Sequence, residues 1–398
     1  MAALPRYVAG AALARTADAG AVVGLVLLAT TGPAGAGAAG LLAACITAPH
    51  LAGPLVARRL DRSPDVRKLL ALACLVYAVA LAAGSTTVGR SPLAVSLALL
   101  VPAGLCGPVL TGGLSSHLPA VVRGDEAVRR AQGWDAVTYG VAGSLGPAAV
   151  ALIAATTSAL PALLLLSGAA LAAAVLVLTL PAPHRDAVPS PGDVVRLRDA
   201  VRLVAAPGLR RAAGTSTVAS LVMGAATVFA VGLAVGLGRP AAAGALLAAL
   251  YGLGNLAGSF LVTAVPLRGD PDRAVLRFGA VVALTFVACG LAPSYPLAVA
   301  AFVAGGVVNG PFFATTLAAR TEYAPVGGRA QVFVTMAAAK VAAAAAGAAV
   351  AGAVGLGRAR EGLVAGGVLV LVVTAALALD RRAHPPQPAT GRRETAEV

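Results

Sequence analysis

Twelve long apolar segments, separated by short stretches that carry most of the charge, constrain what this chain can fold into. Each segment is long enough to cross about 30 Å of hydrocarbon as a helix rising about 1.5 Å per residue. Charged residues make up only 12% of the 398 residues and apolar residues 59%, whereas soluble domains carry about 25% charge. The composition therefore predicts an all-α polytopic membrane protein and excludes a disulfide scaffold, a disordered chain and an ordinary soluble enzyme.

The apolar segments form two groups of six on either side of a hydrophilic stretch at residues 182–212. We place the spans near residues 8–31, 33–57, 69–88, 93–117, 132–156 and 160–181, and then near 213–236, 241–264, 275–293, 296–319, 330–354 and 362–379. The expected domains are an N-terminal six-helix bundle (1–181), a central cytoplasmic loop (182–212) with an amphipathic run near 193–205, a C-terminal bundle (213–379) and a disordered cytoplasmic tail (380–398).

The distribution of basic residues predicts the orientation of the chain in the membrane. With the amino terminus in the cytoplasm, 24 basic residues fall in cytoplasmic segments, four fall on the opposite side, and Arg15 and Lys340 lie inside spans. The positive-inside rule then places both termini in the cytoplasm. Only Lys68 and Lys340 are lysines, a bias we attribute to GC-rich codon usage, and we expect a bacterial inner membrane. The basic residues do not alternate with aromatics on one face, so nucleic acid is not an expected partner.

Short motifs recur between the two halves at offsets of about 200 residues, which predicts an internal repeat. Because each half has an even number of spans, the second half re-enters the membrane in the same direction, and the repeat is parallel. The recurring motifs are Gly107-Pro108 with Gly310-Pro311, Arg130-Ala131-Gln132 with Arg329-Ala330-Gln331, and Pro64-Asp65 with Pro271-Asp272.

The loop after the second span contains Arg58-Arg59-Leu60-Asp61-Arg62-Ser63-Pro64 followed by Arg67-Lys68. Together with the twelve spans and the parallel repeat, it resembles the loop signature of the major facilitator superfamily of secondary transporters. The resemblance carries over to Asp61 and Arg62, and it implies a cytoplasmic gate that opens and closes during alternating access. The alternative is a solvated loop that only sets the orientation of the chain.

Glycine-rich spacing in the fifth span is similar to a Gly-Pro motif of antiporters in that family. The residues are Gly140, Gly143, Gly146 and Pro147. Small residues at this spacing also let helices approach closely, so helix packing alone is the alternative. The arginine that antiporters carry in the fourth span is missing, because residues 92–116 contain no charge.

Charged residues inside spans are the first candidates for ion coupling, because charges at bilayer depth are rare and usually functional. Arg15 and Asp18 stand three residues apart on one helix face, and Lys340 lies well inside the eleventh span. We expect an Asp18–Lys340 ion pair that breaks and reforms during transport. The alternative is an Arg15–Asp18 pair that serves packing, with Lys340 extending toward the membrane surface.

Two further titratable residues are candidates for proton transfer. His50 lies in the second span and titrates near neutral pH, but a buried structural histidine is the alternative. Asp135 follows Trp134 near the start of the fifth span, where it alternatively lies at the level of the lipid headgroups.

Uncharged polar and aromatic residues within the spans are candidates for a mostly apolar substrate cavity. They are Tyr139, Tyr251, Asn255, Asn309, Phe312 and Phe313. Hydrogen bonding between helices is the alternative role for any of them.

The sequence contains no ATP-binding or hydrolytic motif and no metal-ligand spacing, so we expect no enzyme activity, no cofactor, no metal and no ATP. We expect a proton-coupled exporter of a small amphipathic or apolar molecule, with protons and membrane lipid as partners. A proton-coupled or facilitative importer is the alternative within transport, and a non-transporting membrane receptor or assembly partner is the alternative outside it.

Overall fold

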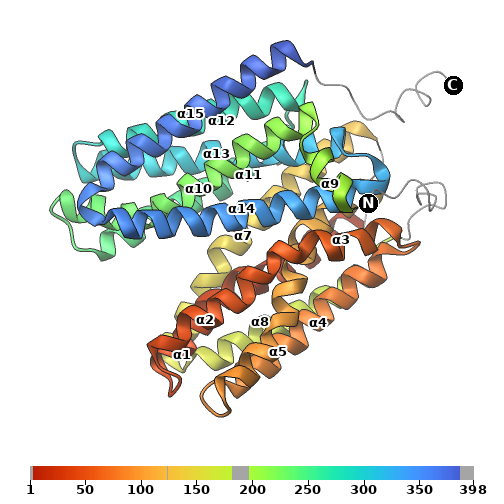
Figure 1. Cartoon of the computed structure of the whole chain (residues 1–398), viewed down its shortest axis with the longest axis vertical. Helices are drawn as coiled ribbons and strands as arrows, with labels where there is room; N and C mark the ends of the chain where they lie inside the picture. Colours follow the sequence, from red (N-terminus) through yellow and green to blue (C-terminus); the bar gives the residue numbers. More distant parts are fainter. Residues whose placement is uncertain (1–2, 123, 182–196, 386–398) are drawn as a thin grey trace. The chain divides into compact units, whose positions relative to one another are not determined.

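The computed structural model describes residues 3–122, 124–181 and 197–385, and this part of the chain contains helices and no strands (Figure 1). The first half consists of α1 (Ala3–Thr31), α2 (Ala36–Thr47), α3 (Gly53–Arg62), α4 (Val66–Thr87), α5 (Leu93–Pro108), α6 (Leu114–Val121), α7 (Asp125–Thr156) and α8 (Ala159–Leu178). The second half consists of α9 (Leu197–Val204), α10 (Pro207–Gly236), α11 (Ala242–Ala264), α12 (Pro271–Leu291), α13 (Tyr295–Tyr323), α14 (Arg329–Val354) and α15 (Ala359–Ala383). The all-α prediction is confirmed.

Twelve described segments are long and apolar enough to cross a membrane, as predicted. Two of them change helix type in their interior, away from the ends of the span. The second span joins α2 to α3 through a 3₁₀ segment at Ala48–Ala52. Pro49 within this segment and Pro54 at the start of α3 each lack a backbone donor. The fourth span joins α5 to α6 through a π-helical turn at Val109–Gly113, directly after Pro108. Such turns are frequent at functional sites.

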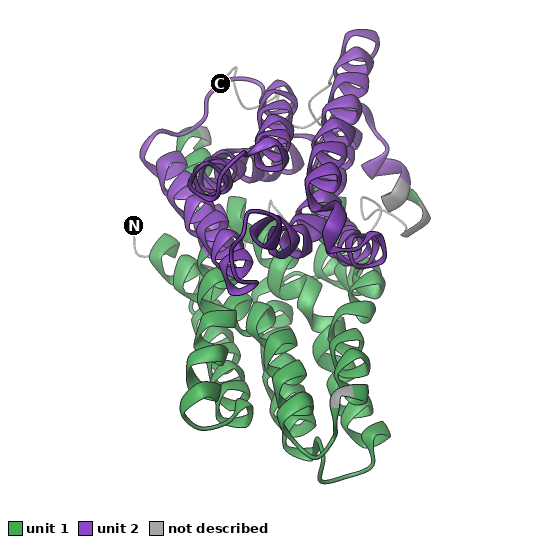
Figure 2. Cartoon of the chain, turned by 90° about the vertical axis from the view of Figure 1, so that its left-hand side faces the viewer, with its two compact units in different colours: residues 1–131, 141–200, 326–338 green, residues 132–140, 201–325, 339–398 purple. Residues whose placement is uncertain are grey.

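The described helices fall into two compact units that do not follow chain order strictly (Figure 2). Unit 1 comprises Met1–Ala131, Val141–Ala200 and Val326–Ala338, and unit 2 comprises Gln132–Gly140, Val201–Pro325 and Ala339–Val398. The division differs from the predicted domains 1–181 and 213–379, because α7 and α14 each contribute to both units. The reason is close packing: in unit 2, a Cβ at Gly133 of α7 would lie 3.0 Å from Thr263 N of α11.

In unit 1, α1 and α4 both pack against α8, and α4 also packs against α5. Helices α1 and α7 meet at two glycines, since a Cβ on Gly146 would lie 2.8 Å from Gly20 N. Gly146 therefore serves close helix packing. A Cβ on Gly143 would meet nothing within 4 Å, so the predicted motif does not act as one packing surface.

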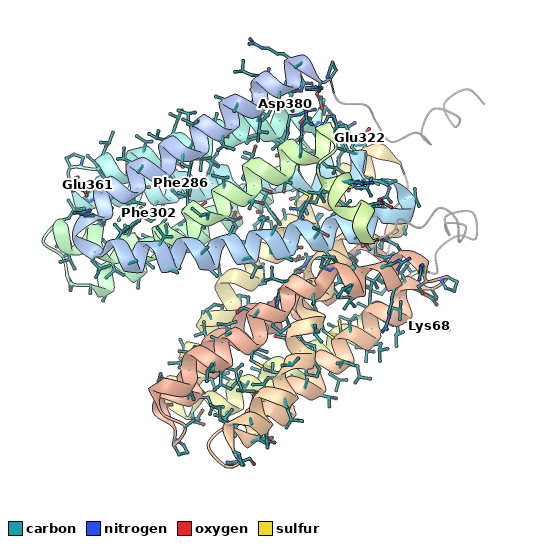
Figure 3. All side chains as sticks on the ribbon, in the orientation of Figure 1. Lys68, Phe286, Phe302, Glu322, Glu361 and Asp380 are labelled. Atoms are coloured by element: carbon teal, nitrogen blue, oxygen red, sulfur yellow. The ribbon has the colours of Figure 1, made fainter. Side chains whose placement is uncertain are left out.

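In unit 2, α11 packs on α13, and α12 lies beside α13 and α15 (Figure 1). The contact between α11 and α13 is close enough that a side chain on Gly258 would collide with Val307 O. Phe286 and Phe302 are buried in this unit, and Glu361 and Asp380 lie toward opposite ends of α15 (Figure 3). The apolar interior of unit 2 is thus built from helix faces that touch backbone to backbone.

The starts of α4 and α12 are alike, but in a different register from the predicted one. Asp65 caps α4 by accepting a hydrogen bond from Arg67 N, and Asp270 caps α12 by accepting one from Asp272 N. Asp65 therefore corresponds to Asp270. The predicted alignment of Pro64-Asp65 with Pro271-Asp272 paired Asp65 with Asp272 and was wrong by two residues. Hydrogen bonds from the Arg67 guanidinium hold the pKa of Asp65 below its ordinary value.

Each of these helix starts is also tied to the last helix of its half. In unit 1, Arg67 donates to Leu180 O, just after α8. In unit 2, Arg381 at the end of α15 donates to Asp272 at 2.9 Å.

The central connection and the tail are described only in part. Helix α9 falls within the amphipathic run expected near 193–205, while 182–196 and 386–398 lie outside the described residues. Helix α15 continues to Ala383, so the predicted tail at 380–398 begins a few residues too early.

Candidate functional site

Asp18 and His50 come together inside unit 1. The distance from His50 Nε2 to Asp18 Oδ2 is 3.9 Å, and the side chains are 6% and 15% exposed respectively. His50 lies in the 3₁₀ segment that joins α2 to α3. Gly107 of α5 leaves room for this pair, since a Cβ there would lie 2.9 Å from Asp18 Oδ1 and closer still to the His50 ring. Sequence reasoning named both residues but not their contact.

One oxygen of the Asp18 carboxylate has no hydrogen-bond partner among the described residues. Asp18 Oδ1 is buried and accepts no hydrogen bond from any residue that the structure describes. Tyr77 of α4 is buried beside Ala17 and interacts electrostatically with Asp18. Buried polar atoms without a partner are uncommon in proteins, so a carboxyl oxygen of this kind is a candidate to hold a proton.

Arg15 is buried on the same helix and binds the region of the π-helical turn. Its guanidinium Nη2 donates to Thr111 O at 3.1 Å and to Ser115 Oγ at 2.9 Å. The turn and the start of α6 therefore each supply an acceptor for a charge that costs about 2.5–3.5 kcal/mol to place at mid-membrane on insertion scales. The predicted Arg15–Asp18 pair stays a prediction. Thr111 and Ser115 were missed because a polar residue within an apolar span does not show which helix it faces.

A second cluster lies in unit 2 around Phe313 of α13. The Lys340 Nζ lies 4.1 Å from the centroid of the Phe313 ring, and the rings of Tyr139 and Phe313 meet edge to face with centroids 4.7 Å apart. Among the described residues of unit 2, no carboxylate lies within ion-pair distance of Lys340. The predicted Asp18–Lys340 pair joins residues of different units and stays a prediction.

Asp135 and Arg320 are buried next to this cluster, each 1% exposed. Arg320 interacts electrostatically with Asp135 and with Tyr139. The burial of Asp135 disagrees with the alternative of a carboxylate solvated at headgroup level. Neighbouring Trp134 meets Phe260 edge to face. Arg320 was not among the predicted site residues, because it falls one residue beyond the expected end of its span.

Of the remaining cavity candidates, three residues serve helix packing and one has a polar group without a hydrogen-bond partner among the described residues. Asn309 Nδ2 donates to Asn255 Oδ1 at 2.9 Å, so these two amides join α13 to α11. Phe312 is buried beside Gly279 of α12 and belongs to the interior of unit 2. The hydroxyl of Tyr251 is buried and has no hydrogen-bond partner among residues 3–122, 124–181 and 197–385.

The loop signature makes a specific contact through Asp61. Its Oδ1 accepts a hydrogen bond from Ala330 N at 2.8 Å, and its Oδ2 accepts one from Gln331 N at 3.1 Å. Both donors belong to the first turn of α14, where backbone N–H groups have no partner within the helix. The carboxylate also meets the positive end of the helix dipole. Arg62 is exposed.

No group of three or more His, Cys, Asp or Glu side chains lies close enough to hold a metal ion within the described part of the chain. Cys45, Cys74, Cys106 and Cys289 are free.

Comparisons with known proteins identify the fold. No known protein-family profile and no curated protein sequence matches this chain. Among solved structures, it is similar to the human organic anion transporter MFSD10 (TETRAN), with a TM-score of 0.76 and 17% identity over 95% of this chain and 100% of that one. It is also similar to the E. coli fucose:proton symporter FucP, with a TM-score of 0.75 and 12% identity over 96% of this chain and 99% of that one.

A third similar structure is a bacterial homologue of the iron transporter ferroportin in its outward-facing state, with a TM-score of 0.71 and 14% identity over 95% of this chain and 100% of that one. FucP is a major facilitator superfamily transporter. The chain therefore has the major facilitator fold.

Proposed function

We propose that this chain is a secondary active transporter that works by alternating access and couples export of a small amphipathic molecule to protons. The observation that carries the proposal is the presence of buried and half-buried ionisable side chains within the membrane spans of both units. Asp18 and His50 form one set, and Asp135, Arg320 and Lys340 form the other. Such groups are costly in a membrane and mark ion or substrate pathways.

Asp18 is the proposed proton carrier. Its oxygen Oδ1 accepts no hydrogen bond from the described residues, and His50 lies near the other oxygen. Protonation of Asp18 removes a negative charge from a site with little solvent, and release of that proton restores it. His50 serves as the neighbouring group that receives or supplies the proton.

Asp61 is the proposed gate residue. Its hydrogen bonds to the first turn of α14 hold α3 and α14 together. Water can replace the carboxylate at these N–H groups when α14 moves, so the contact can open and close in each cycle. We propose that the exposed Arg62 attracts acidic groups at the membrane surface and helps to set the orientation of the chain in the membrane.

The direction of transport is proposed as export because the spans carry few groups that bind sugars. The similar folds include a fucose:proton symporter and an organic anion transporter, so this architecture accommodates both directions and several substrates. We assign the chain to a bacterial inner membrane with both termini in the cytoplasm, from its charge distribution.

The test uses the purified full-length protein in proteoliposomes with an imposed pH gradient. A panel of small amphipathic compounds with negative, neutral and positive charge is assayed for flux. We expect at least one compound to move against its own gradient, and a proton ionophore to abolish this movement. Flux into inside-out oriented vesicles supports export, and flux of the opposite sense supports import. Folded protein that moves no member of the panel contradicts the proposal and favours a receptor.

A further inference from the structure

The charge and the aromatic surface of the unit 2 cluster specify a substrate class, and this inference rests on the proposed transport function. We infer that unit 2 recognises a small molecule with one negative charge next to a flat aromatic group. The ammonium of Lys340 binds the anionic group, and the rings of Phe313 and Tyr139 bind the aromatic part.

The cluster contains two basic side chains, Arg320 and Lys340, and one acidic side chain, Asp135. Asp135 offsets Arg320, with which it interacts electrostatically. Lys340 remains, and among the described residues of unit 2 its Nζ lies over the face of Phe313 and interacts electrostatically with Arg320. Lys340 stands near the middle of the span Val326–Val354, about 21 Å from either end at 1.5 Å per residue. A monoanionic ligand pairs with Lys340 at this depth, far from the lipid headgroups at either end of the span.

A different charged cluster in the same unit shows what a purely structural arrangement looks like. At the ends of α10, α12 and α15, three arginines and three aspartates pair with one another through the contacts of Arg210, Arg211, Arg381, Asp270, Asp272 and Asp380. Its charges balance within the cluster, so it needs no ligand. The cluster around Lys340 differs, because it has one basic side chain more than it has acidic side chains.

The aromatic contacts define how the ligand lies. An ammonium held against a ring face keeps N–H donors that the ring satisfies only weakly, so these donors can bind a carboxylate or sulfonate. The edge-to-face arrangement of Tyr139 and Phe313 is the geometry that aromatic groups prefer in pairs. An aromatic ring attached to the anionic group can therefore extend this stack while its charge meets Lys340.

Tyr251 offers a second polar contact. Its ring lies 3.2 Å from the position of a Cβ on Gly305, and Gly305 precedes Phe313 by about two helical turns on α13, or about 12 Å. The Tyr251 hydroxyl has no partner among the described residues. A ligand that reaches both groups carries a hydrogen-bond acceptor on the side away from its charge.

The binding experiment uses the full chain in lipid nanodiscs and three probes that share a 2-naphthyl group. They are 2-naphthoate, 2-naphthamide and (2-naphthylmethyl)trimethylammonium, measured by isothermal titration calorimetry. We expect 2-naphthoate to bind at least about 30-fold more tightly than the neutral amide, or about 2 kcal/mol at 1.4 kcal/mol per tenfold, and the cation to bind most weakly. Equal binding of the three probes, or no binding by any of them, overturns the inference.

Substitutions assign the preference to Lys340. We expect Lys340→Gln to bring naphthoate and naphthamide within about threefold of each other, and Lys340→Arg to keep most of the preference. Lys68→Gln is the matched control, because Lys68 is the other lysine of the chain and lies in unit 1, near the start of α4 (Figure 3). An unchanged preference in Lys340→Gln overturns the assignment.

A measurement on the unaltered protein covers the case in which Lys340→Gln does not fold. Acetylation of each lysine by N-acetoxysuccinimide is followed by mass spectrometry of its peptide. We expect 2-naphthoate to slow the modification of Lys340 at least about fivefold while 2-naphthamide does not, and we expect Lys68 to react at the same rate throughout. Equal modification of Lys340 with and without 2-naphthoate overturns the inference.

Failure of the proposed function gives a different result. If anion binding depends on Lys340 but a pH gradient drives no flux, the proposed transport function is contradicted and the inferred binding site stands. If a pH gradient drives flux with no preference for the anion, the inferred binding site is contradicted and the proposed transport function stands.

Discussion

The contact between Asp61 and α14 gives a prediction whose magnitude follows from two hydrogen bonds. Asp61 accepts from Ala330 N at 2.8 Å and from Gln331 N at 3.1 Å. Alanine at position 61 removes both acceptors from the start of α14, and loss of a helix cap of this kind costs about 0.5–2 kcal/mol. At 1.4 kcal/mol per tenfold, the first turn of α14 then opens about 2- to 30-fold more often.

Hydrogen–deuterium exchange measures that opening directly, because amide exchange reports local unfolding. In Asp61→Ala we expect the peptide containing Ala330 and Gln331 to exchange about 2- to 30-fold faster, and in Asp61→Asn, which keeps one acceptor oxygen, we expect a smaller change. Arg62→Gln is the control, since this neighbour is exposed. Unchanged exchange of this peptide in Asp61→Ala refutes the reasoning.

Three further predictions concern the helix contacts. Gly146→Ala should destabilise the protein by about 1–3 kcal/mol in thermal unfolding because its Cβ has no space. Gly143→Ala should not destabilise it, because a Cβ there meets no atom and alanine favours the helix, and equal losses of stability would contradict the packing argument. Asp65→Asn should lower the free energy of unfolding at neutral pH. Because Arg67 lowers the pKa of Asp65 in the folded state, the loss of stability relative to wild type should be complete above the ordinary pKa of aspartate. It should disappear as the pH falls through the lowered pKa. Asn309→Ala should cost about 0.6–2 kcal/mol without changing ligand affinity in calorimetry, and a large loss of affinity would move Asn309 from packing to binding.

The sequence was sufficient for the number and class of helices because hydrocarbon thickness fixes the length of an apolar span. It was not sufficient for the changes within spans. The π-helical turn after Pro108 and the 3₁₀ segment containing His50 depend on how neighbouring helices meet their backbone. The assignment of residues 132–140 and 326–338 to the opposite units was likewise unpredictable, because it follows from close contacts between segments far apart in the chain.

The candidate site shows the same division. Asp18, His50, Lys340 and Phe313 were each found as polar or aromatic residues in an apolar span. Their pairing was not found, since hydrophobic periodicity gives no information on which faces of different helices meet. Arg320 was missed for a simpler reason: an arginine at the edge of a predicted span resembles a membrane-surface anchor, and only its burial reveals that it belongs to the interior.

Substitution of Asp18 by asparagine, a side chain of the same shape that carries no titratable proton, tests the central claim most directly. The measurement compares uphill accumulation under a pH gradient with exchange of labelled for unlabelled substrate at equal pH, using a compound that the wild-type protein transports. We predict that Asp18→Asn abolishes accumulation and retains exchange, while Glu126→Gln, at an exposed carboxylate, changes neither. Wild-type accumulation by Asp18→Asn would contradict the account.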